Sequence, residues 1–319
     1  MKILHYKTQM KIMMGISMLI AVTLTSCEKD IDVDLPAYQS KIVIEGSIES
    51  GEPAMVFITR STDYFQKYDM ETITNMFVTD AVVTVTNQSG IVDSLRFMMD
   101  PAQSMPVFYK GSTVLGETGG TYKLKVVVDG KEYMSTTTIL PAIPLDSMNF
   151  VEQDESNHAG IVRASFTDPA GVHNYYRIFT KVLGTDDIFL PVWGGASFDD
   201  RLIDGIHTFG DIYRGDKSNL IQNDTLSSEQ MLNSHYFLPG DTVVVKWCSI
   251  DYSSYQFWYS ADVEIYSGGN PFTSPAPIIS NIPNALGVWC GYGTCLDTIV
   301  IPAGNAKHIS RKISKVRGR

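Results

Sequence analysis

The feature that most constrains the fold is a series of short segments rich in β-branched residues that fills residues 41–140. Turn-forming residues separate these segments, and no apolar pattern of helical period extends over three turns. In one segment Val83 and Val85 alternate with threonines, which is the period of a strand with one buried face. Asp129-Gly130 predicts a tight hairpin, because glycine accepts a positive φ at little cost. About seven strands in roughly 100 residues are typical of an immunoglobulin-like β-sandwich.

The second part of the chain, residues 145–303, is longer and less regular. Two prolines in residues 141–144 keep the backbone extended, so this segment is expected to be an interdomain linker. Strands are predicted at 161–167, 175–183, 241–250, 287–292 and 295–301, the last two forming a hairpin about 291–294. Helices are predicted at 226–233 and at 255–266, the latter capped by Ser253 or Ser254. We therefore expect a mainly β fold: an N-terminal immunoglobulin-like β-sandwich plus a larger β-rich C-terminal domain with one or two short helices.

Residues 1–26 have the parts of a secretory signal peptide: a basic start, an apolar stretch and small residues at its end. The uncharged run is fourteen residues long, whereas about 20 are needed to cross a bilayer. Leu-Thr-Ser-Cys27 matches the bacterial lipobox, in which the cysteine becomes the lipidated first residue of the mature chain. We therefore predict lipidation of Cys27. The alternative is a soluble exported protein in which this cysteine is incidental.

The distribution of charge argues against some classes of partner. Residues 27–40 form an acidic tether, and the formal net charge of the chain is -10. The signal and the tail 304–319 hold nine of the 25 basic residues, so the body between them is more acidic still. Such a body repels nucleic acid and anionic lipid, and no nucleic-acid partner is expected. The basic tail has no periodic apolar face and is expected to be a frayed terminus rather than a binding arm.

Three cysteines follow Cys27, and in an oxidising compartment two of them can pair. The predicted hairpin would place Cys290 and Cys295 on opposed strands, within the Cα separation of a disulfide. We therefore predict this pair, and the pairing of Cys248 is left open.

The search for catalytic motifs gives negative results. The sequence has no Gly-x-Ser-x-Gly nucleophile elbow, no Ser-x-x-Lys pair, no His-Glu-x-x-His and no phosphate-binding glycine loop. The histidines are too scattered for local metal-ligand spacing. We expect no catalytic residues, no metal site and no cofactor. Calcium held by the paired acids Asp186-Asp187 and Asp199-Asp200 is the alternative.

Aromatic residues give a stronger signal, because they are concentrated in the second part of the chain. Exposed aromatic rings can stack on sugar rings or anchor a protein partner. Core packing is the alternative for the aromatics of strands and helices. Trp193, which stands among proline and glycine residues, is expected to be exposed. The candidate ligand or partner contacts are Trp193, Trp289 and Tyr292.

Several segments together resemble one known family: the lipobox, Lys-Ile-Val-Ile-Glu-Gly at 41–46, Asp-Pro-Ala-Gly at 168–171 with Tyr-Tyr at 175–176, and 281–292. The pattern resembles a Bacteroidota outer-membrane lipoprotein family of unknown function, of the DUF 4249 type, over nearly the whole mature chain. The acidic run behind Cys27 is similar to the surface-export signal of such lipoproteins. The resemblance implies a lipid anchor on the outer membrane with the protein exposed at the cell surface. The alternative is a periplasm-facing protein.

Members of that family are often encoded beside TonB-dependent receptors, which implies an accessory role in nutrient capture. We therefore expect a non-enzymatic accessory or ligand-binding partner of a TonB-dependent β-barrel transporter, with the second domain meeting the partner. The alternative is a membrane-anchored hydrolase whose site assembles only in three dimensions. A pocket with paired carboxylates or a Ser-His pair would favour the hydrolase, and a broad apolar patch would favour the accessory role.

Overall fold

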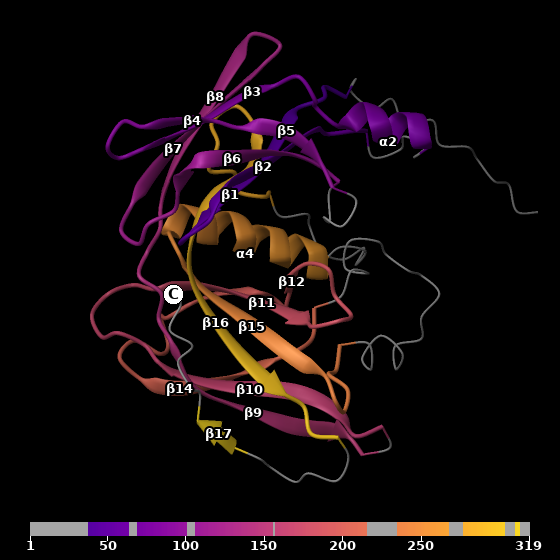
Figure 1. The fold of residues 1–319 in the computed structure, drawn as a ribbon, viewed down its shortest axis with the longest axis vertical. Helices are drawn as coiled ribbons and strands as arrows, with labels where there is room; N and C mark the ends of the chain where they lie inside the picture. Colours follow the sequence, from indigo (N-terminus) through magenta and orange to yellow (C-terminus); the bar gives the residue numbers. More distant parts are fainter. Residues whose placement is uncertain are drawn as a thin grey trace, which may run out of the picture. The chain divides into compact units, whose positions relative to one another are not determined.

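The computed structural model describes most of the chain after residue 37 (Figure 1). The described residues are 38–63, 69–100, 106–155, 157–215, 235–267, 277–303 and 310–312. The structure is mainly β, with 53% of residues in strands and 9% in helices, which confirms the predicted fold class. From Ser40 onward the chain forms one compact unit. The signal, Cys27, most of the tether and the predicted helix 226–233 lie outside the described residues.

The first half of the unit contributes a four-stranded sheet with the order β4-β3-β7-β8. Its strands are β3 (Val82–Asn87), β4 (Val92–Ser94), β7 (Thr121–Val128) and β8 (Lys131–Thr138). Val83 and Val85 are buried, as the alternating pattern predicts. The predicted hairpin joins β7 to β8, and Asp129 and Gly130 have φ values of 51° and 74°. Two positive φ values are what a two-residue hairpin turn of this kind requires.

A nine-stranded sheet extends through both halves, in the order β12-β11-β15-β16-β1-β2-β6-β5 with β13 paired to β11. The strands from the first half are β1 (Ile42–Glu49), β2 (Pro53–Arg60), β5 (Arg96–Met99) and β6 (Val107–Leu115). The strands from the second half are β11 (Tyr175–Val182), β12 (Leu190–Pro191), β13 (Ser197–Asp199), β15 (Thr242–Ile250) and β16 (Leu286–Val300). Residues that the sequence assigns to two domains therefore share one sheet.

The strand that joins the two halves is β16, and it corrects a sequence prediction. Its first half pairs in parallel with β1, and its second half pairs antiparallel with β15. The predicted hairpin about 291–294 is therefore wrong, because these residues continue one strand. The glycines there permit a close approach of backbones: a Cβ on Gly293 would lie 1.8 Å from the carbonyl oxygen of Leu140.

The first hydrophobic core contains residues from β1, β2, β3, β7 and β16, so it forms between the four-stranded sheet and part of the nine-stranded sheet. Trp289 of β16 is fully buried in it, and its Nε1 donates to the carbonyl oxygen of Tyr122 at 2.9 Å. Gly46 of β1 makes room for the indole, since a Cβ there would lie 2.8 Å from a ring carbon of Trp289. The sandwich predicted for residues 41–140 is therefore completed by a segment near the C-terminus.

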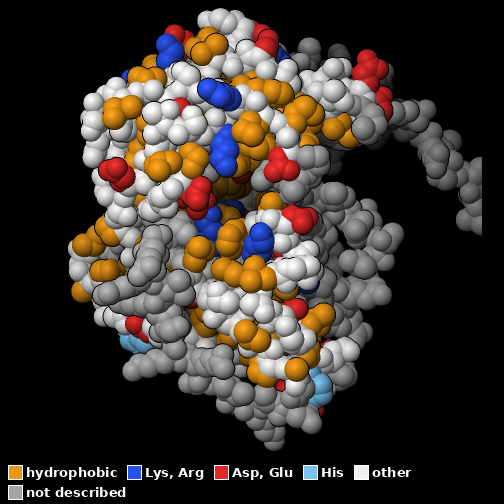
Figure 2. Space-filling model, viewed as in Figure 1, with side chains coloured by type: hydrophobic (Ala, Val, Ile, Leu, Met, Phe, Trp, Pro, Cys, Tyr) orange, Lys and Arg blue, Asp and Glu red, His pale blue; other side chains and the backbone are white. Residues whose placement is uncertain are grey.

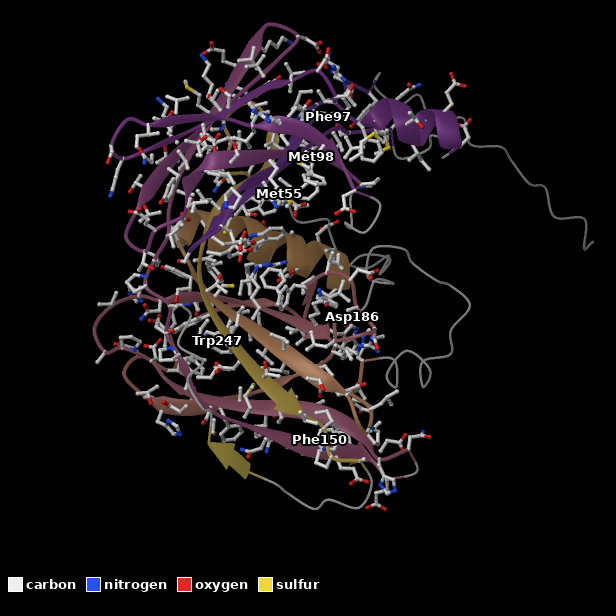
Figure 3. The ribbon with its side chains drawn as sticks, in the orientation of Figure 1. Met55, Phe97, Met98, Phe150, Asp186 and Trp247 are labelled. Atoms are coloured by element: carbon white, nitrogen blue, oxygen red, sulfur yellow. The ribbon has the colours of Figure 1, made fainter. Side chains whose placement is uncertain are left out.

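The second core contains residues of β11 and β15 together with residues of a third sheet, ordered β14-β10-β9-β17. The strands of the third sheet are β9 (Leu145–Asp154), β10 (Ala159–Thr167), β14 (His207–Ile212) and β17 (Ser310–Lys312). Trp247 of β15 points into this core, with its ring centroid 4.7 Å from that of Phe166 (Figure 3). Three residues of the predicted basic tail therefore form a strand rather than a frayed end.

Two helices lie in the described part of the chain, α2 (Met70–Met76) and α4 (Tyr252–Ser267). α4 extends the predicted helix 255–266 by three residues at its start. Its cap is Asp251 rather than a serine, because Asp251 Oδ1 accepts a hydrogen bond from the backbone of Ser254 at 2.8 Å. Of the helices described, neither is long and apolar enough to cross a membrane.

Candidate functional site

A pocket of about 410 Å³ opens in the second half of the unit, where α4 lies against β11 and β13. Its volume is within the roughly 300–1,000 Å³ typical of small-molecule sites. Four tyrosines belong to the lining, which consists of His173, Tyr175, Asp199, Arg201, Tyr252, Tyr255, Gln256, Tyr259, Ser260 and Ile279. Aromatic walls with a few polar groups are the usual composition of a binding site.

The four tyrosines form a continuous aromatic wall. Tyr252, Tyr255 and Tyr259 recur at spacings of three and four, so α4 presents them on one face. Tyr175 of β11 stacks on Tyr255, with centroids 4.9 Å apart and an interplanar angle of 27°. Its ring also lies 5.3 Å from that of Tyr252, and Tyr259 lies 5.4 Å from Tyr255. The outer members, Tyr252 and Tyr259, are 54% and 47% exposed and are free to meet a ligand.

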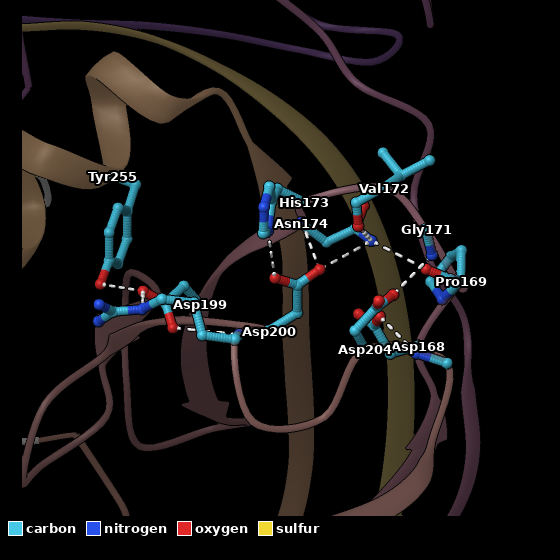
Figure 4. Close-up of polar contacts among 12 residues, drawn as sticks. Asp168, Pro169, Gly171, Val172, His173, Asn174, Asp199, Asp200, Asp204 and Tyr255 are labelled. Atoms are coloured by element: carbon cyan, nitrogen blue, oxygen red, sulfur yellow. Dashed lines mark hydrogen bonds and ion pairs between the residues drawn. The ribbon is translucent and has the colours of Figure 1, made fainter.

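The polar edge of the pocket is organised by Asp199 at the end of β13 (Figure 4). Its Oδ2 accepts a hydrogen bond from the Tyr255 hydroxyl at 3.0 Å and forms an ion pair with Arg201 Nε at 2.7 Å. Burial raises the pKa of Tyr255, and the hydrogen bond to Asp199 raises it further. The hydroxyl therefore keeps its proton at neutral pH and remains a donor. This arrangement fixes the aromatic ring and leaves the guanidinium of Arg201 at the rim.

A group of three carboxylates lies beside the pocket, contributed by Asp168, Asp200 and Asp204 (Figure 4). One oxygen of each lies within 4.8 Å of the others, and Asp168 and Asp200 are buried. These oxygens are the ligand type that calcium prefers. They are the described side chains that could hold a divalent cation, and the expectation of no metal site stays a prediction.

Hydrogen bonds from neighbouring groups hold these carboxylates in place. The Tyr176 hydroxyl donates to Asp168, and the backbone of Asn174 donates to Asp200 Oδ2 at 2.7 Å. Gly171, whose φ is 78°, donates its N–H to Asp204 at 2.7 Å. Burial, followed by the hydrogen bond to Asp168, raises the pKa of Tyr176, which keeps this hydroxyl a donor. His173, on the pocket wall, has its Nδ1 3.4 Å from Asp200 and so links the pocket to the carboxylates.

The structure places the three predicted ligand or partner contacts in different environments. Trp289 is fully buried in the first core, so the prediction that it contacts a ligand is wrong, because a side chain without exposure cannot reach one. Tyr292 is 5% exposed and lines a second, smaller cavity. Trp193 is half-buried and stacks on His235, with centroids 4.6 Å apart. None of the three lines the tyrosine pocket.

The predicted pairing of Cys290 with Cys295 is also wrong. Both residues belong to β16, and no disulfide joins them. Five residues along one strand span roughly 16 Å, whereas the Cα atoms of a disulfide lie within about 7 Å. Cys248 and Cys290 are buried thiols, and burial raises the pKa of each to about 12. Lipidation of Cys27 stays a prediction, because this residue lies outside the described part of the chain.

The sequence indicated some segments of this site, but it did not predict that they lie next to one another. It named Asp199-Asp200 as paired loop acids and 168–171 as a turn, but these segments are some thirty residues apart. Register pairs Tyr175 with Asp199 across β11 and β13, and this pairing brings the two loops to one place. The helical spacing of the tyrosines in α4 was the signal available for the aromatic wall. Of the other suggested calcium acids, Asp186 instead pairs with Arg214 at 3.0 Å.

Comparison with known proteins identifies the family of the chain. No curated protein matches the chain. Among solved structures, a DUF4785 family protein from Legionella pneumophila is similar at 11% identity, with a TM-score of 0.21, over 66% of this chain and 52% of that chain. The chain thus spans about half the length of that protein, and a TM-score of this size does not establish a common fold. The sequence profile described as a domain of unknown function, DUF4249, matches residues 28–294, and the chain belongs to this family.

Proposed function

We propose that this protein is a lipid-anchored, non-enzymatic binding protein of the outer membrane that acts as an accessory partner of a TonB-dependent β-barrel transporter in nutrient uptake. The observation that carries the proposal is the tyrosine pocket of about 410 Å³ on the second half of the unit. Its aromatic wall offers faces for stacking, and its polar groups are held in fixed positions by one another. Such preorganised walls favour binding, because little entropy is lost when the ligand arrives.

The exposed apolar side chains of α4 support a protein partner next to this pocket. Tyr259, Val263 and Tyr266 follow one another at spacings of four and three, so they form a stripe along one face of the helix. They are 47%, 37% and 43% exposed, and Tyr259 also belongs to the pocket. Exposed apolar stripes of this kind mark protein interaction sites. A transporter docked on the stripe would be close to a ligand held in the pocket.

The proposal is tested by purifying the tagged full-length protein from detergent-solubilised outer membrane and identifying the co-purified proteins by mass spectrometry. A TonB-dependent β-barrel is the expected partner. Val263→Asp places a charge in the apolar stripe and should lower recovery of the barrel at least about tenfold, since burying an unpaired charge at an interface costs several kcal/mol. Val82→Asp, which makes the same change at a side chain of β3 that is 62% exposed, is the matched control. Equal recovery with both variants would contradict the assigned surface.

A hydrolase is the second candidate, and one observation favours it. Asp199 brings a carboxylate to a pocket wide enough for a substrate, and the buried carboxylate of Asp200 belongs to the group of three carboxylates beside it. Pairs of carboxylates carry out acid and base catalysis in glycoside hydrolysis. Incubation of the purified protein with peptides and glycans decides between the two: turnover that is abolished in Asp199→Asn would establish the hydrolase and exclude the non-enzymatic role.

A further inference from the structure

A second cavity lies apart from the tyrosine pocket, where β1 and β2 face β11, β15 and α4. Its volume of about 150 Å³ is below the range of drug-sized pockets and suits a small molecule or a single side chain. The face drawn in Figure 2 is hollowed near its middle, with hydrophobic, basic and acidic side chains around the hollow. Charged groups in such a cavity act strongly on a ligand, because the surrounding protein has a low dielectric constant.

One cation in the cavity is already neutralised by the protein itself. Lys246 of β15 forms an ion pair with Glu49 of β1 across the cavity. Its Nζ also lies 5.2 Å, 5.3 Å and 5.5 Å from the ring centroids of Phe179, Phe189 and Tyr292. These cation–π contacts and the ion pair hold the ammonium in one position. Lys246 therefore has its counter-charge within the chain.

The second cation is balanced in the same way. Arg177 of β11 is buried, and its Nη1 lies 3.4 Å from Asp262 of α4 and donates to Ser197 at 2.6 Å. Its guanidinium lies 3.8 Å from the ring centroid of Trp258, which lines the cavity. Asp262 therefore offsets the charge of Arg177.

Glu45 of β1 has no such counterpart. It belongs to the cavity lining, its side chain is exposed, and among the described residues its carboxylate makes no hydrogen bond and no ion pair. Although the side chain is partly exposed, desolvation by the protein raises the pKa of Glu45, and the field of Arg177 opposes this rise. Register pairs Glu45 with Phe57 of β2, so an aromatic ring stands beside the carboxylate on the same face of the sheet. A carboxylate next to aromatic faces is the arrangement that recognises an organic cation.

We propose that this cavity binds a primary alkylammonium group, which pairs with Glu45 and lies against the aromatic rings of the lining. Glu49 balances the charge of Lys246, and Asp262 balances that of Arg177. The negative charge of Glu45 remains without a partner among the described residues. Tyr292, which also lines the cavity, stays neutral, because burial raises its pKa well above its ordinary value. The inference does not rest on the function proposed above, because it concerns a different cavity and different residues.

The test compares three probes of the same length and different charge on the full-length protein in detergent: n-butylammonium, n-butanol and butyrate. Dissociation constants are measured by ligand-observed NMR titration at neutral pH. We expect n-butylammonium to bind about tenfold or more tightly than n-butanol, since a charge-assisted contact is worth more than a neutral one, and butyrate to bind least. Equal affinity for the three probes, or no binding of the ammonium, overturns the proposal.

Two variants locate the binding at this cavity. Glu45→Gln should reduce the affinity for n-butylammonium to that for n-butanol, whereas Glu52→Gln, in the turn after β1, removes the same charge outside the cavity and should have no effect. Phe57→Leu should weaken binding several-fold by removing one aromatic face. Thermal unfolding of each variant shows that it is folded. Ammonium affinity that is unchanged in Glu45→Gln overturns the proposal.

An ammonium group can belong to a free amine or to a lysine side chain of a partner, and a further probe distinguishes these sources. N-acetyl-lysine methylamide carries the same group on a peptide backbone. If it binds as tightly as n-butylammonium, the cavity admits a lysine of a protein partner. If only n-butylammonium binds, the backbone is excluded and the ligand is a small amine. Either result supports recognition of the ammonium group.

Discussion

At the scale of single residues, Glu45 connects the ionisation of one carboxyl to the stability of the fold. Although its side chain is partly exposed, desolvation by the surrounding protein raises its pKa above the ordinary value of 4.5. The folded chain therefore holds this proton more tightly than the unfolded chain does. Ionisation costs no stability below the ordinary pKa, and the cost grows as the pH rises to the folded-state pKa and remains above it. The same carboxylate that attracts a ligand thus destabilises the empty cavity at neutral pH.

We predict that Glu45→Gln melts at a higher temperature than the wild-type protein at about pH 7, and that this advantage shrinks at about pH 4. Glutamine cannot ionise, so it escapes the cost that the wild-type carboxyl meets at neutral pH. Melting curves followed by circular dichroism at both pH values measure the effect, with Glu52→Gln as the control for loss of a charge. A difference between variant and wild type that does not depend on pH would contradict the assigned desolvation.

At the scale of elements, β16 joins the two halves of the unit, because its first half pairs with β1 and its second half pairs with β15. Trp289 anchors its first half in the core against Gly46, without exposure. We predict that Trp289→Ala lowers the free energy of unfolding by about 3–5 kcal/mol, through the cavity left behind and the lost hydrogen bond to Tyr122. Urea titration measures this loss. Trp193→Ala, at a half-buried side chain, should cost less, and the reverse order would contradict the assigned packing.

At the scale of the whole molecule, the first half of the unit is incomplete without the C-terminal segment. The first core takes Ile282, Ala285 and Trp289 from that segment. We predict that a fragment of residues 38–144 is poorly ordered alone and gains a dispersed NMR spectrum when a peptide of residues 280–293 is added. The peptide supplies the strand beside β1 and the indole that fills the core. A well-dispersed spectrum of the fragment alone would show that the first half folds independently.

Local patterns in the sequence were sufficient for some of the elements. The alternation around Val83 and Val85 depends only on neighbours two residues away, and Asp129-Gly130 determines its turn through its own backbone preferences. The helical spacing from Tyr255 to Tyr259 likewise needs only one turn of α4. These features were predicted because the interactions that produce them lie within a few residues. The lipobox belongs to the same class, since it is read as a linear motif.

Tertiary structure decided which of these elements lie together. The glycines at 291–294 suggested a turn, and only the approach of Leu140 shows that they let two backbones pass closely within a continuous strand. The pocket depends on pairing Tyr175 with Asp199, and the smaller cavity depends on bringing Glu45 of β1 close to Trp258 of α4. By itself the sequence determined a mainly β fold and the helix that the structure shows as α4, and it predicts lipidation of Cys27. The neighbours of Glu45, Asp199 and Trp289 come from distant segments, and their positions follow from packing of the whole chain, because contacts of this kind leave no periodic pattern along the sequence.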